Sequence, residues 1–105
     1  MGGRGRNSDR YHMHEGKQGK HIPGHNNYIP GRSTITVSKE KLQQLFNEYK
    51  GTGEKIGNKE VHVNFNETIG QYVNQETGES QATSWGTIHY DNTGGWHIVP
   101  EMPGE

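Results

Sequence analysis

One apolar stripe in the middle of the chain limits the folds that are open to it. Four large side chains recur at i, i+3, i+4 and i+7: Leu42, Leu45, Phe46 and Tyr49. Ser38 stands before them as a helix N-cap, and Lys50 with Gly51 closes the pattern as a helix end. The spacing predicts one amphipathic helix, in which Tyr49 packs in the core. Such a helix needs a second layer to cover its stripe, and we expect a sheet.

The chain after Glu60 supplies that sheet, because its apolar residues alternate with polar ones and turn residues separate the runs. Four strands are predicted: Val61 to Phe65, Ile69 to Val73, Ala82 to Tyr90 and Trp96 to Pro100. Short turns between them favour antiparallel pairing. The expected fold class is therefore α+β, with the helix packed on a four-stranded antiparallel sheet. A small all-β barrel with the helix as a minor cover remains an alternative.

The last two strands have a register that the sequence specifies. A five-residue loop over 91–95 predicts three cross-strand pairs: Tyr90 with Trp96, His89 with His97, and Ile88 with Ile98. One face of the hairpin is then apolar, and the other carries Thr87, Val99 and the two histidines. Paired imidazoles away from the helix suit acid–base cleavage of RNA, since both titrate near neutral pH. Seven histidines in 105 residues also allow a chance pairing of ordinary exposed side chains.

A basic loop precedes the helix, from Lys17 to Ser33, and reads KQGKHIPGHNNYIPGRS. It has no acidic residue and little that a core can use, so other parts of the chain must hold it in place. Its glycines and prolines predict fixed bends that orient the flanking cationic side chains. Residues 1–33 carry a net charge of +4 and residues 34–105 a net charge of −5. The loop can therefore hold phosphates or, alternatively, dock on the acidic remainder of its own chain.

Several blocks of the sequence resemble one known family. These blocks are Lys17-Gln18-x-Lys20-His21-Ile22-Pro23-Gly24, Asn27-Tyr28, Gly31-Arg32-Ser33, LFNEYKGTG from Leu45, and GTIHYDNTGGWHIVP from Gly86. In this order they are similar to the polymorphic toxin type 50 domain, which is regarded as a bacterial ribonuclease toxin. Its domains lie at the carboxyl ends of larger polymorphic toxins and also of phage head-morphogenesis, or minor capsid, proteins. The resemblance implies the α+β plan of barnase-like, colicin-like and RelE-like ribonucleases.

Length and composition predict one thin-cored domain. With 26% hydrophobic residues and no cysteine, a chain of 105 residues has a modest core and no disulfides. We expect a disordered lead-in over residues 1–16, a toxin-like ribonuclease domain over 17–100, and a disordered tail over 101–105. No apolar stretch spans a bilayer, and no signal-peptide core follows Met1. Delivery as part of a larger protein, with action in the bacterial cytoplasm, is the expectation, and association with a virion is the alternative.

The leading functional hypothesis is a metal-independent endoribonuclease without a cofactor. The expected catalytic residues are His21, His89, His97 and Lys20, and the expected substrate-binding residues are Lys17, Arg32, Ser33 and Thr87. A histidine takes the proton from the ribose 2′-OH, and a second group protonates the leaving 5′-oxygen. Since the loop and the hairpin each lack a complete catalytic set, we expect them to meet in space.

Two other functions stay open at this point. The histidines of the loop and the hairpin are possible ligands of a metal site: His21, His25, His89 and His97. A non-enzymatic domain of a phage head or minor capsid protein is the other alternative. The expected partners are RNA and, in a producing cell, an acidic immunity protein that covers the basic loop, because complementary charge speeds association.

Overall fold

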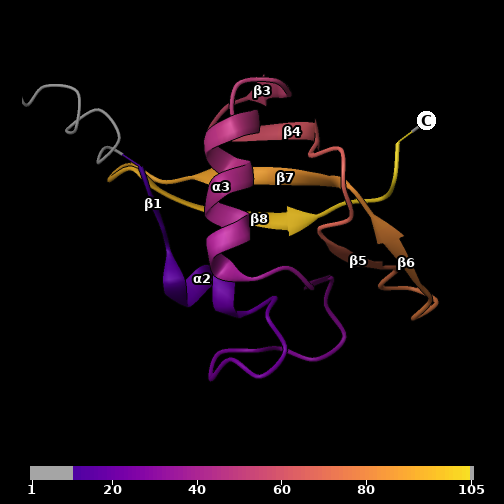
Figure 1. Ribbon diagram of the computed structural model, residues 1–105. Helices are drawn as coiled ribbons and strands as arrows, with labels where there is room; N and C mark the ends of the chain where they lie inside the picture. Colours follow the sequence, from indigo (N-terminus) through magenta and orange to yellow (C-terminus); the bar gives the residue numbers. More distant parts are fainter. Residues whose placement is uncertain (1–10, 105) are drawn as a thin grey trace, which may run out of the picture.

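The computed structural model describes residues 11–104. Within this range there are two helices, α2 (Glu15–Gly19) and α3 (Lys39–Tyr49). The strands are β1 (His12–Met13), β2 (Thr34–Ile35), β3 (Glu54–Ile56), β4 (Lys59–Asn64), β5 (Gly70–Val73), β6 (Ser80–Thr83), β7 (Trp85–Tyr90) and β8 (Gly95–Pro100). Figure 1 shows α3 lying across one face of the strands, with α2 and the basic loop below it.

The strands form two sheets instead of one. The main sheet has the order β1-β8-β7-β4-β3, and the side sheet has the order β2-β5-β6. Only the β1–β8 pair is parallel within the described residues, and β1 is two residues long. The side sheet lies beyond the carboxyl end of β8 (Figure 1). The α+β prediction is confirmed, while the single four-stranded antiparallel sheet is wrong, and residues 11–104 form no closed barrel.

The sheets separate because the chain breaks where one long strand was expected. The predicted strand from Ala82 to Tyr90 is divided at Ser84, after which the chain leaves the side sheet for the main sheet. The Thr83 hydroxyl accepts from the Trp85 N–H at 3.0 Å and donates to the Glu101 carbonyl at 2.9 Å. These bonds satisfy the backbone at the break, so the interruption costs little.

The core lies between α3 and the main sheet, as the apolar stripe predicted. The Ser38 hydroxyl caps the helix by accepting from the Lys41 N–H at 3.0 Å. The Phe46 ring stacks on Trp96 with centroids 4.1 Å apart and planes 5° apart. The buried hydrophobic residues are Ile35, Leu42, Leu45, Phe46, Val63, Phe65, Ile69, Ile88, Trp96 and Ile98. Because residues from both sheets enter this cluster, one core holds the two sheets together.

The register of the last hairpin is confirmed. His89 pairs with His97, Ile88 with Ile98, and Tyr90 with Trp96, as expected. The buried Ile88, Trp96 and Ile98 face α3, so the two histidines face away from it. The carboxylate of Asp91 closes the turn by accepting from the N–H groups of Thr93 and Gly95, each at 2.8 Å. We call the face of the main sheet away from α3 the outer face.

A buried carboxylate fixes the chain after α3. Glu60 is 2% exposed and accepts hydrogen bonds from the N–H groups of Gly51 and Gly53 and from the Tyr90 hydroxyl. Burial and the bond to Glu60 raise the pKa of Tyr90. Glu60 points inward because β4 has a bulge between Glu60 and Val63, so both residues face the core. The bulge also gives His62 a positive φ of 58°.

Both predicted disordered ends need correction where the structure describes them. Residues 1–10 and 105 lie outside the described range, but His12–Met13 forms β1 and Glu15 begins α2. Glu101 is tied down, since its N–H donates to the Trp85 carbonyl at 3.0 Å. The amino-terminal residues are ordered because β1 pairs with the edge of β8. Glu101 is ordered because it continues the ladder between β8 and β7. None of the helices within residues 11–104 has the length and apolar character to cross a membrane.

Replacing Phe46 with alanine should lower the free energy of unfolding by about 3–5 kcal/mol, because a fully buried ring leaves a cavity under Trp96. Urea unfolding followed by tryptophan fluorescence measures this change. Glu48→Ala, at an exposed position on the same helix, is the control and should stay within about 0.5 kcal/mol of the parent. A loss below about 1 kcal/mol for Phe46→Ala would contradict the described core.

Candidate functional site

Three imidazoles lie in a row on the outer face. The rings of His89 and His97 are stacked with centroids 4.7 Å apart and planes 12° apart. The His21 ring from the basic loop continues the row, 6.5 Å from His97 and at 14° to it. We call His21, His97 and His89 the histidine row. The prediction that the loop and the hairpin meet in space is confirmed, and the catalytic roles stay predictions.

The backbone fixes the tautomer of His21. Its Nδ1 lies 2.9 Å from the Ser33 carbonyl oxygen, and the residue is 7% exposed. A carbonyl oxygen only accepts hydrogen bonds, so Nδ1 must carry the proton. In the neutral ring Nε2 is therefore the basic nitrogen. The His21 carbonyl accepts from the Ile35 N–H at 2.7 Å, which joins the start of the loop to β2.

One buried side chain connects the loop to the hairpin. The carboxamide of Gln18 donates to the Ile98 carbonyl at 2.8 Å and accepts from the Ile98 N–H at 2.7 Å. Gln18 is fully buried, and β8 pairs with β1 only through Gly95 and Trp96. The amide thus takes the place of the next residue of β1 along the free edge of β8. This contact places α2, and with it His21, beside the outer face of β8.

A close approach of two segments fixes the position of His25. A Cβ added to Gly19 would lie 2.3 Å from the imidazole of His25, so this ring occupies the space left by the glycine. His25 Nδ1 accepts from the Asn27 N–H at 3.0 Å. His25 therefore packs within the basic loop instead of joining the histidine row. Among residues 11–104, no group of three or more histidine and carboxylate side chains is arranged to hold a metal ion.

The predicted cationic residues are exposed, but they are placed differently. Lys17 and the pair His89–His97 line one small hollow of about 130 Å³ at the turn of the last hairpin. Lys20 is the C-cap of α2, next to His21 in the chain. Arg32 lies on the other side of His21, in a second hollow that also contains Val99. The cations thus lie at both ends of the histidine row.

The two predicted hydroxyl groups have partners within the protein. The Ser33 hydroxyl accepts from the Val73 N–H at 3.0 Å, and Ser33 is 7% exposed. The Thr87 hydroxyl donates to the Glu101 carboxylate. Both groups stabilise the site in this structure, because they join the loop to β5 and β7 to the end of the chain. Their expected substrate contacts stay predictions.

Sequence reasoning missed three residues on the outer face. Lys59 pairs with His89 across β4 and β7, and it shares the face of the histidine row. His62 Nδ1 lies 2.9 Å from the Glu101 carboxylate, which also accepts from the His62 N–H at 3.1 Å. An earlier start for the strand predicted from Val61 would have revealed Lys59. The bulge at His62 has no sequence signal, and Glu101 was assigned to a disordered tail.

Burial and neighbouring cations keep the histidine row neutral. The pKa of His97 is lowered to about 4, mostly by burial and to a smaller extent by His89, His21 and Lys17. The pKa of His89 is lowered by burial, then by Lys59. The pKa of His21 is lowered by burial, although its bond to the Ser33 carbonyl opposes the shift. At pH 7 the row therefore offers unprotonated imidazoles beside fixed positive charges, which is the state required of a general base.

Removing the Gln18 carboxamide should uncouple the loop from the hairpin. Gln18→Ala leaves the N–H and C=O of Ile98 without partners and should reduce the free energy of unfolding by about 2–4 kcal/mol. Urea unfolding measures the loss, and NMR contacts between the His21 and His97 rings report the uncoupling. Gln44→Ala, at an exposed position on α3, should change neither. A Gln18→Ala protein with parental stability would show that the carboxamide does not hold the loop.

Stability should fall as acid protonates the histidine row. The pKa of His97 is below its unfolded value of about 6.5, so the unfolded chain binds more protons between about pH 6.5 and 4. The stabilising contribution is complete above pH 6.5 and is lost toward pH 4. Thermal unfolding from pH 7.5 to 4.5 measures this, and His97→Gln should show a smaller loss than the parent. Equal losses in both proteins would rule out His97 as a source.

Comparison with known proteins assigns the sequence that forms this site to a family. No curated protein sequence matches the chain. The family model described as Bacterial toxin 50 matches residues 13–100, from β1 to the last residue of β8. The match includes the basic loop, Gln18 and all three histidines of the row, and it confirms the resemblance drawn from the sequence. The chain therefore belongs to the bacterial toxin 50 family and is a toxin domain.

Proposed function

We propose that this toxin domain is a metal-independent endoribonuclease that uses the histidine row for acid–base catalysis. The observation that carries the proposal is the stacking of His21, His97 and His89 on the outer face of the main sheet, with cations at both ends. A phosphodiester seated on this face would bring its 2′-OH, phosphorus and 5′-oxygen within reach of two imidazoles. RNA is the substrate because the reaction uses the ribose 2′-OH as its nucleophile.

The roles follow from the protonation states. His97 is unprotonated at pH 7 and lies between His21 and His89, so it serves as the base that removes the 2′-OH proton. The 2′-oxygen then attacks phosphorus, which leaves a 2′,3′-cyclic phosphate and a 5′-hydroxyl end. The acid is His21 or His89, because a bound phosphate anion favours the protonated form of a neighbouring imidazole. Lys17 at the turn and Lys59 on β4 stabilise the charge that develops on the phosphoryl oxygens.

His97→Ala should reduce cleavage of a fluorescent RNA by about 100-fold or more, since general-base catalysis typically contributes at least that factor. The same substitution should make expression harmless to a bacterial host. His12→Ala, which removes an exposed histidine on β1, is the matched control and should cleave and kill like the parent. Cleavage by the parent should survive EDTA, because the proposed reaction uses only protein groups.

Three outcomes would contradict the proposal. Undiminished cleavage by His97→Ala would place the active site elsewhere. Activity lost in EDTA and restored by zinc or magnesium would indicate a metal-dependent nuclease. A parent protein that neither cleaves RNA nor harms the host would favour a non-enzymatic domain.

A further inference from the structure

A second hollow begins where the histidine row ends. It has a volume of about 450 Å³ and lies between the end of β8, strand β5 and the last residues of the basic loop. Its lining residues are His21, Arg32, Ser33, Tyr72, Val73, Gln75, Val99 and Pro100. Of these lining residues, the proposed reaction uses His21 alone, as a candidate acid. A volume in this range is typical of small-molecule sites.

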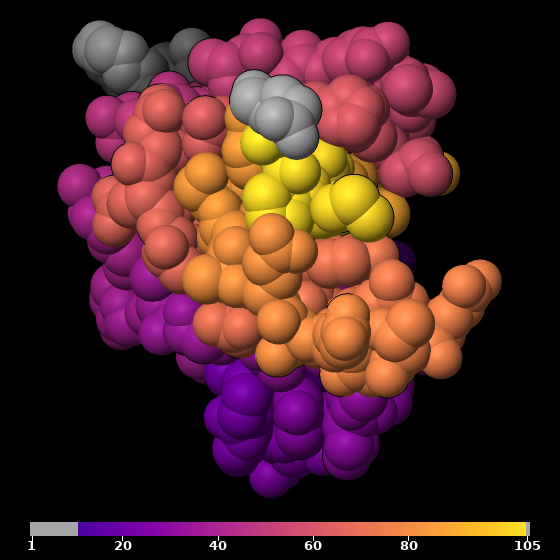
Figure 2. Space-filling model, turned by 90° about the vertical axis from the view of Figure 1, so that its right-hand side faces the viewer, coloured from indigo at the N-terminus to yellow at the C-terminus, as the bar shows by residue number. Residues whose placement is uncertain are grey.

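Contacts between distant segments shape this hollow. The Ser33 hydroxyl accepts from the Val73 N–H at 3.0 Å, and the Gln75 side chain donates to the Gly31 carbonyl at 2.8 Å. These two bonds hold the end of the basic loop against the hairpin of β5 and β6. Figure 2 shows the loop (indigo to purple) directly below this hairpin (orange). The walls are therefore built by tertiary contacts and are ready before any ligand arrives.

The hollow is continuous with the histidine row. His97 lines the first hollow and Val99 the second, and both side chains lie on the outer face of β8. Residues two apart along a strand are separated by about 7 Å. His21 stacks near His97 and also lines the second hollow, so it stands at the boundary between them. A strand of RNA cleaved at the row would therefore continue past His21 into the second hollow.

The side chains in the hollow match the parts of a nucleotide. Tyr72 is partly exposed and lies at this hollow and at a neighbouring one that contains Met102, and Val99 adds apolar surface from β8. Arg32 is exposed at the same hollow and offers a guanidinium group. Aromatic rings beside a cation are the usual means of holding single-stranded nucleic acid, because bases stack on the ring and the cation neutralises the phosphate.

We propose that this hollow is a nucleotide subsite, in which Tyr72 stacks the base next to the scissile phosphate and Arg32 binds the phosphate of that nucleotide. The inference rests on the proposed ribonuclease function and deepens it, since it gives the enzyme a preference for RNA extended on one side of the cleaved bond. The side-chain amide N–H of Gln75 donates to the Gly31 carbonyl, and within residues 11–104 its carbonyl oxygen has no hydrogen-bond donor, so it can accept from a base.

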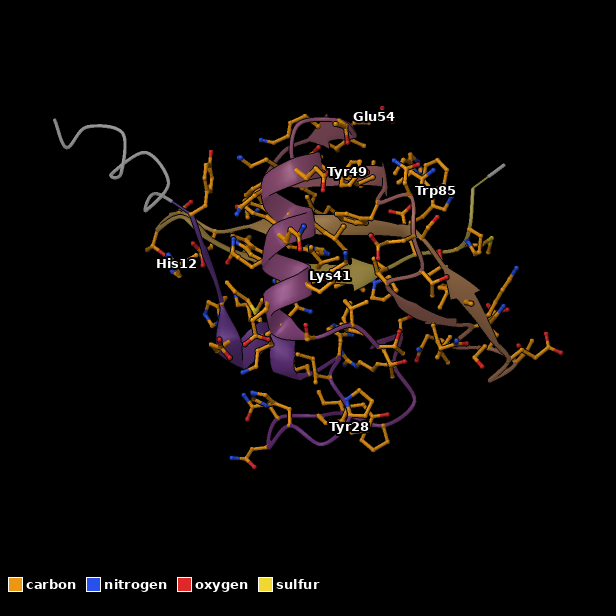
Figure 3. The ribbon with its side chains drawn as sticks, in the orientation of Figure 1. His12, Tyr28, Lys41, Tyr49, Glu54 and Trp85 are labelled. Atoms are coloured by element: carbon orange, nitrogen blue, oxygen red, sulfur yellow. The ribbon has the colours of Figure 1, made fainter. Side chains whose placement is uncertain are left out.

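The first test compares cleavage of a dinucleotide with cleavage of two trinucleotides, each extended on one side. The parent should cleave one trinucleotide with kcat/KM at least tenfold above the dinucleotide. Tyr72→Ala should lose roughly tenfold on that trinucleotide, because stacking on one ring is worth about this factor, whereas Tyr72→Phe should keep the preference. Arg32→Ala should also lower kcat/KM on that trinucleotide. Lys41→Ala is the cationic control and should leave the preference unchanged. Figure 3 shows Lys41 on α3, and α3 packs on the face of the main sheet opposite to the outer face.

The second test measures binding without cleavage. Adenosine 5′-monophosphate added to the His97→Ala chain should shift the NMR amide signals of Tyr72 and Val73, and Tyr72→Ala should raise its Kd about tenfold. Inorganic phosphate, the comparison ligand, should bind with the same Kd to the chains with and without the Tyr72→Ala substitution. A parent that cleaves RNA without any length preference, with an unchanged Kd in Tyr72→Ala, would overturn the subsite alone. A parent that cleaves no RNA, while the mononucleotide still binds at Tyr72, would overturn the ribonuclease and leave the subsite in place.

Discussion

The two hydrogen bonds between the Gln18 carboxamide and the backbone of Ile98 are the contact on which the candidate site depends. The basic loop has few apolar side chains, so it cannot hold its position through a core of its own. A fully buried amide that continues the edge of β8 gives it a fixed place instead. The cost of leaving Ile98 unpaired makes this placement specific, because any shift of α2 would bury unsatisfied polar groups. Stability and site geometry are therefore coupled through one side chain.

The placement of the loop beside the hairpin lowers the pKa values of the three histidines of the row. Packing three imidazoles together disfavours their charged forms, so the folded protein loses the protons that free histidines would hold in mild acid. The same crowding gives His97 the unprotonated ring that a base requires. Cations at both ends of the row reinforce the effect, since Lys59 lowers the pKa of His89 and Lys17 that of His97. The row therefore makes the fold sensitive to acid, while the cations beside it suit the site to bind anions.

The sequence predicts those parts of the structure whose position is set by a pattern within one local segment. The stripe of α3 and the register of the last hairpin are correct, because a shift in either would move polar side chains into the core. The division of the strands into two sheets escapes prediction, since the break at Ser84 depends on the Thr83 hydroxyl and the distant Glu101. Gln18 and the bulge at His62 escape for the same reason, because their partners lie far away in the chain.

For the site itself, sequence reasoning brought the three histidines together with the cations of the basic loop, but it missed Lys59. Lys59 joins the row through β4, whose expected start at Val61 was too late. Lys17, expected to bind substrate, lines the hollow at the hairpin turn together with His89 and His97. Such side-chain positions depend on how separate elements dock, which a periodic pattern in one element does not encode.

The contact between Gln18 and Ile98 joins residues that are 80 positions apart. It has a consequence for the order of assembly during synthesis. While the ribosome is still producing β7, the loop has no strand edge to bind, and neither His97 nor Val99 exists to complete the outer face. A nascent or prematurely terminated chain that ends before residue 98 therefore lacks the assembled site. Contacts between residues this far apart in the chain close slowly relative to local helix formation.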